Sequence, residues 1–454
     1  MIAVFLIKCL GFFAYCLPDC IRRAICVVLG WGFWFGPFDR RRRILANLKR
    51  CFPEKPPRWR SKIGRESCCR LIEMGMFVLV SPFLTKKQIR ARFVLDNELL
   101  ALMQDVLKNP KPLVILGPHF TLMEGAAFFP ALTDEKLPET GVLYRPLDYK
   151  PLDKWVKQTR ERHGVKLVDR KGQMMDAIHN LNKGGALTIL YDQNAGAPGA
   201  QTLFFGRAAS TTQMPGMFVE RFKARVGVLY AQRTRFFRAT IKGEAFLIEP
   251  TRQAVMLEST RWLERKLSTD DDNITADWLW AHNRWGRRRA YECMFNVRPP
   301  NSMLDVFFKA DNIQDIPDKD RYWITLPKDK KRLEALLPVL QQHKRHRPDI
   351  RITALCESDA LETVKAANIA DDVVSRTGRP LSFFLKIRNT YPEVHLVFEE
   401  SLRANVEAFL MGAFLRVGFK SRGSFLLTDR IRPPKGDYAA RYRAFAKACH
   451  MRFE

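Results

Sequence analysis

Long apolar runs are scarce in this chain of 454 residues. The longest uncharged apolar piece is residues 24–38, which hold 15 residues. An α-helix of that length spans about 22 Å, less than the roughly 30 Å hydrocarbon core of a bilayer. Composition also excludes a chain that is mainly disordered, because 46% of the residues are hydrophobic and 27% are charged. We therefore expect a folded protein that is not a polytopic membrane protein.

Cysteine is also sparse. The chain has 10 cysteines, seven of them within the first 69 residues, and no two have the C-x-x-C spacing of a zinc or redox site. Disulfides persist in oxidising compartments, where small secreted domains use many of them. We expect reduced cysteines, no metal site and a protein that faces the cytosol.

Three catalytic signatures are missing. The sequence has no G-x-S-x-G elbow, no H-E-x-x-H helix and no G-x-x-x-x-G-K-[ST] loop. Serine hydrolases of the α/β type, zincins and P-loop enzymes depend on these patterns. No cofactor is expected.

Acidic side chains are greatly outnumbered by basic ones. The chain carries 76 Lys and Arg against 48 Asp and Glu, a net charge of +28. Residues 1–300 hold 49 basic and 28 acidic side chains (+21), whereas residues 301–454 hold 27 and 20 (+7). Anionic lipid surfaces, phosphorylated substrates, acidic carrier proteins and nucleic acid all suit such a field. Charge alone does not select among these partners.

The N-terminal segment, residues 1–38, is the most apolar part of the chain. Four charged residues interrupt it. The segment ends with GWGFWFGPF (30–38), and the basic run DRRRR (39–43) comes directly after it. Aromatic residues favour the membrane interface, and a basic cluster favours anionic lipid. We expect attachment to a membrane from the cytosolic side, either as an interfacial anchor or as a transmembrane span. A buried helix pair in a soluble protein is the alternative.

The remaining sequence indicates two α/β regions. Residues 39–300 contain β-like runs separated by amphipathic helical stretches, an alternation typical of an α/β domain. Residues 301–320 have the composition of a linker. A second α/β pattern over residues 321–454 predicts one Rossmann-like half domain.

His119 is the strongest catalytic candidate. It follows the apolar strand 113–116 and a Gly-Pro turn, which places it at the carboxyl end of a strand, where open α/β sheets bind ligands. Glu124 lies five residues further on. Its carboxylate could hold the Nδ1 proton of the imidazole and leave Nε2 free as a general base for a hydroxyl. H-x-x-x-x-E is a weak signal by itself.

Seven short motifs accompany His119. In chain order they are NLKRCFPE (47–54), YRP (144–146), PLDKW (151–155), R-x-R-x-G (160–164), YDQN (191–194), LFFG (203–206) and WAHNRW (280–285). Together they resemble the late acyltransferases of lipid A biosynthesis, the lauroyl and myristoyl transferases of Gram-negative bacteria. The resemblance covers residues 1–300 and implies a mixed sheet flanked by helices.

The resemblance implies a role for each site residue. His119 would be the base and Glu124 its orienting partner. The arginines would stabilise the thioester oxyanion or hold a phosphate, and the two phenylalanines would be either core residues or a wall of the acyl pocket. The implied residues are Arg145, Arg160 and Arg162 for the anion, Asp192 and Asn194 for support, with Asp192 expected to steady an arginine, and Phe204 and Phe205 for the acyl chain.

The same resemblance implies the reaction and its setting. An acyl chain would pass from an acyl carrier protein thioester to a hydroxyl of a phosphorylated lipid A precursor, at the cytoplasmic side of the inner membrane of a Gram-negative bacterium. Anionic membrane, acidic carrier protein and phosphorylated acceptor would then all meet the basic surface, and nucleic acid would not be a partner. A glycerolipid or lysophospholipid acyltransferase is one alternative, although the glycerol phosphate acyltransferases have Asp where this sequence has Glu124. A basic lipid- or nucleic-acid-binding protein without catalysis is the other.

The C-terminal region resembles a different family. Residues 321–434 are similar to the N-terminal half of heptosyltransferases, through LPVLQQHKRHRPDIRITAL (337–355) and YPEVHLVFEESLRANVEAFLMGAFLRVGF (391–419). That family has an Asp where this sequence has Arg332, and we expect no second Rossmann domain to bind a nucleotide sugar. We therefore expect no glycosyl transfer by this chain alone. The alternatives for this region are a remnant, a docking module for the sugar part of the acceptor, and one half of a split enzyme.

Overall fold

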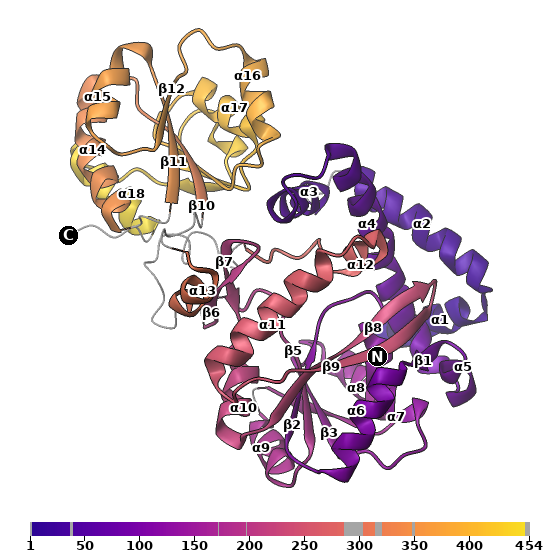
Figure 1. Ribbon diagram of the computed structural model, residues 1–454. Helices are drawn as coiled ribbons and strands as arrows, with labels where there is room; N and C mark the ends of the chain where they lie inside the picture. Colours follow the sequence, from indigo (N-terminus) through magenta and orange to yellow (C-terminus); the bar gives the residue numbers. More distant parts are fainter. Residues whose placement is uncertain are drawn as a thin grey trace. The chain divides into compact units, whose positions relative to one another are not determined.

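A computed structural model describes residues 2–36, 40–170, 172–196, 198–285, 303–313, 320–346 and 350–449 (Figure 1). Contacts along the chain divide it into two compact units. The first comprises Met1–Phe205 and Thr211–Arg284, and the second comprises Gly206–Ser210 and Trp285–Glu454.

The first unit begins with four helices. Their bounds are α1 (Ile2–Cys16), α2 (Asp19–Phe35), α3 (Arg40–Cys51) and α4 (Pro57–Val80). Both α1 and α2 pack along α4. Arg22 of α2 is buried and pairs with Asp19 at 2.6 Å, and Arg92 reaches the same carboxylate at 2.9 Å. Over the residues that the structure describes, no helix is both long and apolar enough to cross a membrane.

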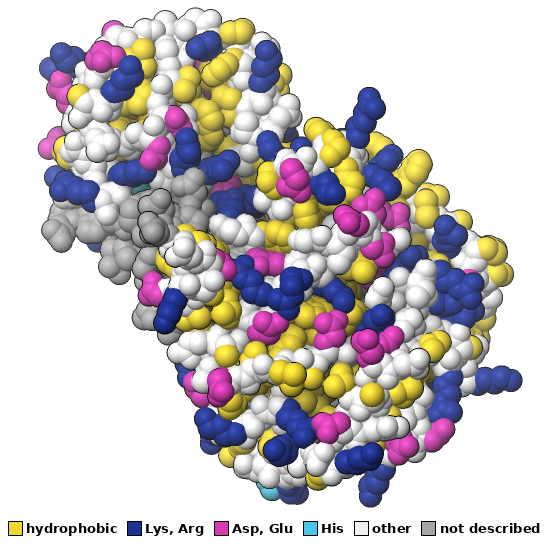
Figure 2. All heavy atoms as spheres, viewed as in Figure 1, with side chains coloured by type: hydrophobic (Ala, Val, Ile, Leu, Met, Phe, Trp, Pro, Cys, Tyr) yellow, Lys and Arg dark blue, Asp and Glu magenta, His cyan; other side chains and the backbone are white. Residues whose placement is uncertain are grey.

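The outer faces of α1 and α2 expose many large apolar side chains, part of which are visible over α2 in Figure 2. These residues are Ile2, Phe5, Leu6, Leu10, Phe12, Phe13, Ile21, Val27, Val28, Leu29, Trp31 and Phe35. A soluble surface rarely gathers so many apolar groups without a partner.

A seven-stranded sheet forms the centre of the first unit. Its strands are β1 (Phe93–Leu95), β2 (Leu113–Gly117), β3 (Thr140–Tyr144), β4 (Val165–Asp169), β5 (Ala186–Leu190), β8 (Arg225–Arg235) and β9 (Arg238–Ala245). The spatial order is β1-β9-β8-β2-β5-β3-β4, and every neighbouring pair is parallel except β8 and β9. The sheet is therefore mixed, as the resemblance implied.

Helices surround this sheet. They are η1 (Ser81–Phe83), α5 (Lys86–Arg90), α6 (Asn97–Lys108), η2 (Met123–Phe128), α7 (Phe129–Leu132), α8 (Lys150–Glu161), α9 (Met174–Asn182), α10 (Met214–Phe222), α11 (Arg252–Leu267) and α12 (Asp272–Asp277). Side-chain caps at Thr85, Asp96 and Thr251 fix the first turns of α5, α6 and α11. A separate two-stranded sheet consists of β6 (Ala200–Phe204) and β7 (Arg207–Thr211).

The second unit contains one parallel sheet of six strands. Its elements are α13 (Leu304–Asp311), β10 (Asp320–Thr325), α14 (Lys330–His346), β11 (Ile350–Cys356), η4 (Ser358–Ala360), α15 (Leu361–Ala366), β12 (Asp372–Ser375), α16 (Leu381–Arg388), β13 (Val394–Val397), α17 (Leu402–Met411), β14 (Leu415–Phe419), η5 (Ser424–Leu426), β15 (Asp429–Ile431) and α18 (Tyr438–Ala448). The spatial order β12-β11-β10-β13-β14-β15 is that of a doubly wound Rossmann sheet. The region of the predicted Rossmann-like half domain thus forms one six-stranded sheet with helices.

The predicted linker lies partly outside the described residues. Within it, α13 forms a short helix at Leu304–Asp311, and residues 301–302 and 314–319 are outside the described ranges.

The switch point of the second sheet lies between β10 and β13, where doubly wound sheets bind their ligands. Side chains of the unit itself pair there. Arg332 donates to Glu400 at 2.6 Å and to the Phe398 carbonyl at 3.2 Å, and Arg441 donates to both oxygens of Glu400 at 2.8 and 2.9 Å. Arg332, which stands where the heptosyltransferases have an Asp, is therefore part of an ion-pair cluster.

Candidate active site

The register of two central strands brings His119 and Asp192 together. β2 and β5 are parallel neighbours, and Gly117 at the end of β2 pairs with Leu190 at the end of β5. The two residues of this pair are 73 positions apart (190 − 117). His119 and Asp192 are also 73 positions apart, and each lies two residues beyond its strand. The pairing of the strands thus continues into the loops that carry the site.

Asp192 holds His119 through two hydrogen bonds. The imidazole Nδ1 lies 2.5 Å from Oδ1 of Asp192, and the His119 backbone N–H donates to Oδ2 at 2.8 Å. Trp278 donates its indole N–H to the same Oδ2 at 2.7 Å. Both members of the pair are buried, with 8% of His119 and 2% of Asp192 exposed. The imidazole therefore has a fixed orientation in a nearly dry environment.

The charge on Asp192 sets the tautomer of His119. Burial by itself would raise the pKa of Asp192, but the charge of His119 and the hydrogen bonds from His119 and Trp278 lower that pKa to about 2. An ionised carboxylate only accepts hydrogen bonds, so Nδ1 carries the proton that lies between the two residues. Nε2 is the nitrogen left to act on a substrate, as in the Ser-His-Asp arrangement.

The segment after His119 is joined to the chain around Trp278. Phe120 forms a β-bridge with Trp278, and Thr121 donates to the Asp277 carbonyl from its backbone N–H at 3.1 Å. Arg70 of α4 pairs with Asp277 at 3.3 Å. These contacts fix the indole of Trp278 against Asp192.

The predicted partnership of Glu124 with His119 is corrected by the structure, because Asp192 occupies that place. Glu124 lies on η2 and forms a bidentate ion pair with Arg160 of α8, with Nε to Oε1 at 2.6 Å and Nη2 to Oε2 at 2.9 Å. Burial lowers the pKa of Arg160, but the Glu124 charge and hydrogen bonds outweigh burial and raise it. Asp192 contacts His119 and Trp278 directly, and its charge also opposes the lowering by burial of the pKa of Arg284. The prediction that Asp192 steadies an arginine therefore holds, with Arg284 as that arginine.

The other two predicted arginines occupy different places. Arg162 follows α8 and donates to the backbone carbonyls of Pro82, Ser81 and Leu84 at 2.5, 3.3 and 2.9 Å, so it ties α8 to η1. Arg145 is exposed in the loop after β3. The structure thus joins Arg160 to Glu124, whereas Arg162 contacts the backbone of another element.

Asn194 supports the loop that carries Asp192. Its backbone N–H donates to Nε2 of His282 at 2.9 Å, and its side-chain amide donates to the Asn283 carbonyl at 3.1 Å. Asn47 of α3 donates to the carbonyls of Trp280 and His282 at 3.0 and 2.9 Å. Three motifs far apart in the sequence, at 47–54, 191–194 and 280–285, therefore meet in one hydrogen-bonded cluster.

Phe204 and Phe205 belong to an aromatic cluster. Phe204 is 1% exposed and packs edge-on against Trp278, while Phe205 has its ring edge-on to Phe52 and adopts a positive φ of 49°. Arg284 is buried over the face of Phe204 and donates to Thr211, and burial lowers its pKa to about 10. Phe204 is a core residue behind the His119–Asp192 pair.

Sequence reasoning did not find Trp278 as a site residue. It lies two positions before WAHNRW, and long-range contacts such as the β-bridge to Phe120 bring it to Asp192. Among the described residues, no group of three or more His, Cys, Asp or Glu side chains is arranged to hold a metal ion.

One family model matches this chain over residues 1–287, more than half of its length, and describes bacterial lipid A biosynthesis acyltransferases. The chain belongs to this family. It is accordingly an acyltransferase of lipid A synthesis. Every residue of the site described above lies inside the matched range. No curated protein matches the chain.

Among solved structures, this lipid A acyltransferase is similar to glycosyltransferases over a limited part of its length. One is the glycosyl transferase family 9 protein of Veillonella parvula, with 14% identity, 30% of this chain and 43% of that chain covered, and a TM-score of 0.27. Another is an E. coli heptosyltransferase with ADP, with 14% identity, 29% and 48% covered, and a TM-score of 0.26. This chain thus spans less than half the length of either structure.

Proposed function

We propose that this acyltransferase transfers a fatty acyl chain from an acyl carrier protein thioester to a hydroxyl of a lipid A precursor, with His119 as the general base. The observation that carries the proposal is the contact between Nδ1 of His119 and Asp192, which orients the imidazole and commits its second nitrogen to a substrate. Ester formation from a thioester needs a deprotonated hydroxyl, and a base near neutral pH supplies it.

The proposed reaction needs only the acceptor hydroxyl, the thioester and the His119–Asp192 pair. Nε2 of His119 takes the proton of the acceptor hydroxyl as its oxygen attacks the thioester carbonyl. The tetrahedral intermediate then breaks its carbon–sulfur bond, and the departing thiolate receives the proton from the imidazolium. The products are an ester on the acceptor and a free thiol on the carrier. Asp192 stabilises the imidazolium between these two proton transfers.

Arg160 supports the anionic step of this proposal. Its ion pair with Glu124 uses Nε and Nη2, so the guanidinium is fixed in orientation while Nη1 remains for an oxyanion or a phosphate oxygen. Glu124 therefore acts as a positioning residue for Arg160. This role explains why a carboxylate five residues after the base is useful without contact to the base.

The proposed location is the cytoplasmic side of the inner membrane, with the exposed apolar face of α1 and α2 lying in the interface. Several aromatic and aliphatic residues of this face are more than half exposed, among them Phe5 at 66% and Val28 at 68%. The basic start of α3, residues 40–43, follows α2 and would meet anionic lipid. Both the acyl chain and the acceptor would then lie at the membrane interface, beside the enzyme.

Acyl transfer in detergent tests this function. Purified protein is mixed with carrier-protein thioesters of several chain lengths and a lipid A precursor, and the acylated product is measured by mass spectrometry. His119→Ala should lower the rate by on the order of 100-fold or more. The matched control is His179→Ala, because His179 lies on α9, outside the site.

Two outcomes would contradict the proposal. Folded wild-type protein that binds the precursor and forms no product with any donor would leave a lipid-binding protein without catalysis. Equal rates for His119→Ala and His179→Ala would remove His119 from the chemistry.

A further inference from the structure

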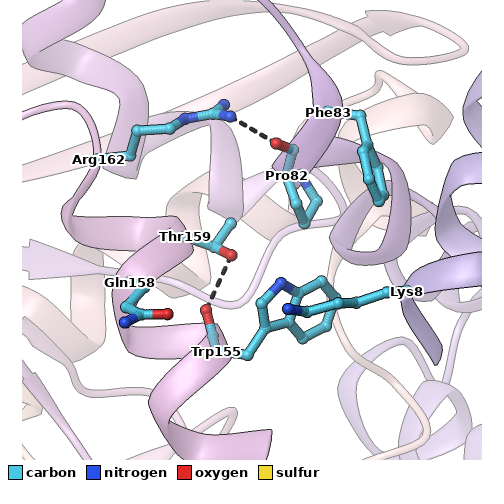
Figure 3. A pocket seen from close by; sticks show the side chains of 7 residues that line it. All are labelled: Lys8, Pro82, Phe83, Trp155, Gln158, Thr159 and Arg162. Carbon is cyan, nitrogen blue, oxygen red and sulfur yellow. Dashed lines mark hydrogen bonds between the residues drawn. The ribbon is translucent and has the colours of Figure 1, made fainter. Parts of the chain in front are cut away.

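A cleft of about 270 Å³ lies on the surface of the first unit, and neither His119 nor Asp192 is among its lining residues (Figure 3). Three elements meet around it, namely α1, η1 and α8. The lining residues are Lys8, Pro82, Phe83, Trp155, Gln158, Thr159 and Arg162.

One face of α8 forms a wall of the cleft. Trp155, Gln158, Thr159 and Arg162 follow the spacing i, i+3, i+4 and i+7, which places them on a common helix face. Arg160 lies on a different face and pairs with Glu124. The same helix therefore contributes one face to the ion pair with Glu124 and another to the cleft.

Arg162 joins two walls of this cleft through hydrogen bonds. Its guanidinium donates to the carbonyls of Pro82, Ser81 and Leu84 and to His163, which consumes most of its N–H groups. Lys8 from α1 makes no ion pair with any residue that the structure describes, and its side chain is exposed. Lys8 thus supplies the cation with the most free donors, beside the positive field of Arg162.

We propose that this cleft binds the phosphate group of an anionic lipid. The Lys8 ammonium and the Gln158 amide provide donors, and Trp155 with Phe83 provides an aromatic wall for the glycerol and the first methylenes. Lysine or arginine together with tryptophan is the combination found where proteins meet the headgroup layer. The matching carboxylates that would suit a cationic ligand are not among the lining residues.

The position of the cleft favours a lipid over a soluble anion. Lys8 lies on α1, and its neighbours Phe5 and Phe12 on that helix are 66% and 54% exposed. Phe12 also packs edge-on against Phe83 at the rim, with ring centroids 5.7 Å apart. A ligand with its phosphate in the cleft would place its acyl chains along these exposed rings.

A calorimetric titration of the full chain with short-chain phosphatidylglycerol, kept below its critical micelle concentration, tests this site. Lys8→Glu should weaken binding by about fivefold to tenfold, because the substitution removes the cation and places a negative charge beside the phosphate. The matched control is Lys108→Glu on α6, an exposed lysine outside the cleft that makes the same change in net charge. Trp155→Phe should weaken binding less than Trp155→Ala, because it keeps the aromatic wall.

Two further probes identify the source of the phosphate. Inorganic phosphate should compete poorly, and short-chain phosphatidylcholine should bind more weakly because its choline opposes Lys8. Equal weakening by Lys8→Glu and Lys108→Glu would overturn the site. Inorganic phosphate that displaces phosphatidylglycerol at equal concentration would overturn the lipid assignment. Acyl transfer by the wild-type protein tests the proposed function separately, because the binding titration does not depend on catalysis.

Discussion

Asp192 accepts hydrogen bonds from both the ring and the backbone of His119, through Oδ1 at 2.5 Å and Oδ2 at 2.8 Å. One carboxylate thereby fixes the rotation of the imidazole and the path of the loop that carries it. A change at this carboxylate should therefore disturb both.

Asp192→Asn should reduce acyl transfer strongly while the protein stays folded. The amide keeps the shape but cannot stabilise an imidazolium, and its NH₂ group can present a donor where Nδ1–H needs an acceptor. We expect a rate loss of roughly 100-fold or more in kcat. Steady-state kinetics with the carrier-protein thioester measure it, and a loss confined to KM would contradict the role.

Stability should depend on the ionisation of Asp192 at low pH. Its pKa in the folded protein is about 2, below the ordinary value of 3.8, so ionised Asp192 stabilises the fold at pH values above that ordinary value. This stabilisation amounts to about 2 kcal/mol and is lost as the pH falls from about 4 toward 2. Urea unfolding of wild type and Asp192→Asn at pH 5 and pH 3 checks this. A difference in unfolding free energy that stays constant between the two pH values would contradict it.

Trp278→Phe should act on the site through Asp192. The substitution removes the indole donor at 2.7 Å from Oδ2 and leaves the aromatic packing, so the pKa of Asp192 should rise. The carboxylate charge is then less dispersed and favours the protonated form of the His119–Asp192 pair, so the acid limb of the pH–rate profile should move to higher pH. Trp280→Phe is the matched control, because Trp280 is equally buried and donates to the Thr275 carbonyl instead. Both variants should lose about 1–2 kcal/mol of stability. A shifted profile in both, or in neither, would refute the positioning role.

Glu124→Gln should impair catalysis without altering the ionisation of the base. The variant breaks the bidentate pair with Arg160, so Arg160 loses its fixed orientation. We expect a rate loss of about tenfold to 100-fold. The pH–rate profile should keep the shape of wild type, in contrast to Trp278→Phe. A double-mutant cycle of Glu124→Gln with Arg160→Gln should give rate effects that are far from additive; additive effects would mean that the two residues act separately.

Gly164→Ala should destabilise the turn that ends α8. Gly164 has a φ of +104°, where a Cβ is strained, although the space around it is sufficient because the nearest atom would be Pro130 Cβ at 3.5 Å. We expect a loss of about 1–2 kcal/mol. Gly32→Ala on α2 has open space and a helical backbone, so it should be neutral or stabilising. Thermal unfolding of the two variants distinguishes backbone strain from the loss of a glycine as such.

The sequence allowed the base to be predicted but not its partner. His119 follows an apolar strand and a Gly-Pro turn, and the structure confirms that it lies at the carboxyl end of β2. The partner depends on which strand lies beside β2, and a local pattern does not contain that information. The local pattern therefore points to Glu124, the nearest carboxylate in the chain, whereas Asp192 is the one that contacts the imidazole.

The same limit applied to the fold. The continuous apolar run at 113–116 predicts a strand, and β2 confirms it. Short strands such as β1, with three residues, lack enough residues to show a period and become visible only through pairing with β9. In the second unit, the order of six strands depends on long-range pairing in the same way.

The continuation of the β2–β5 register into the loops has a consequence for heat inactivation. His119 and Asp192 are each tethered within two residues of central strands, so the pair can separate only when the ladder between those strands opens. Central strands of a sheet open with nearly the full free energy of unfolding. Catalytic geometry should therefore persist up to the temperature at which the first unit melts, and activity should disappear together with the sheet rather than decline ahead of it.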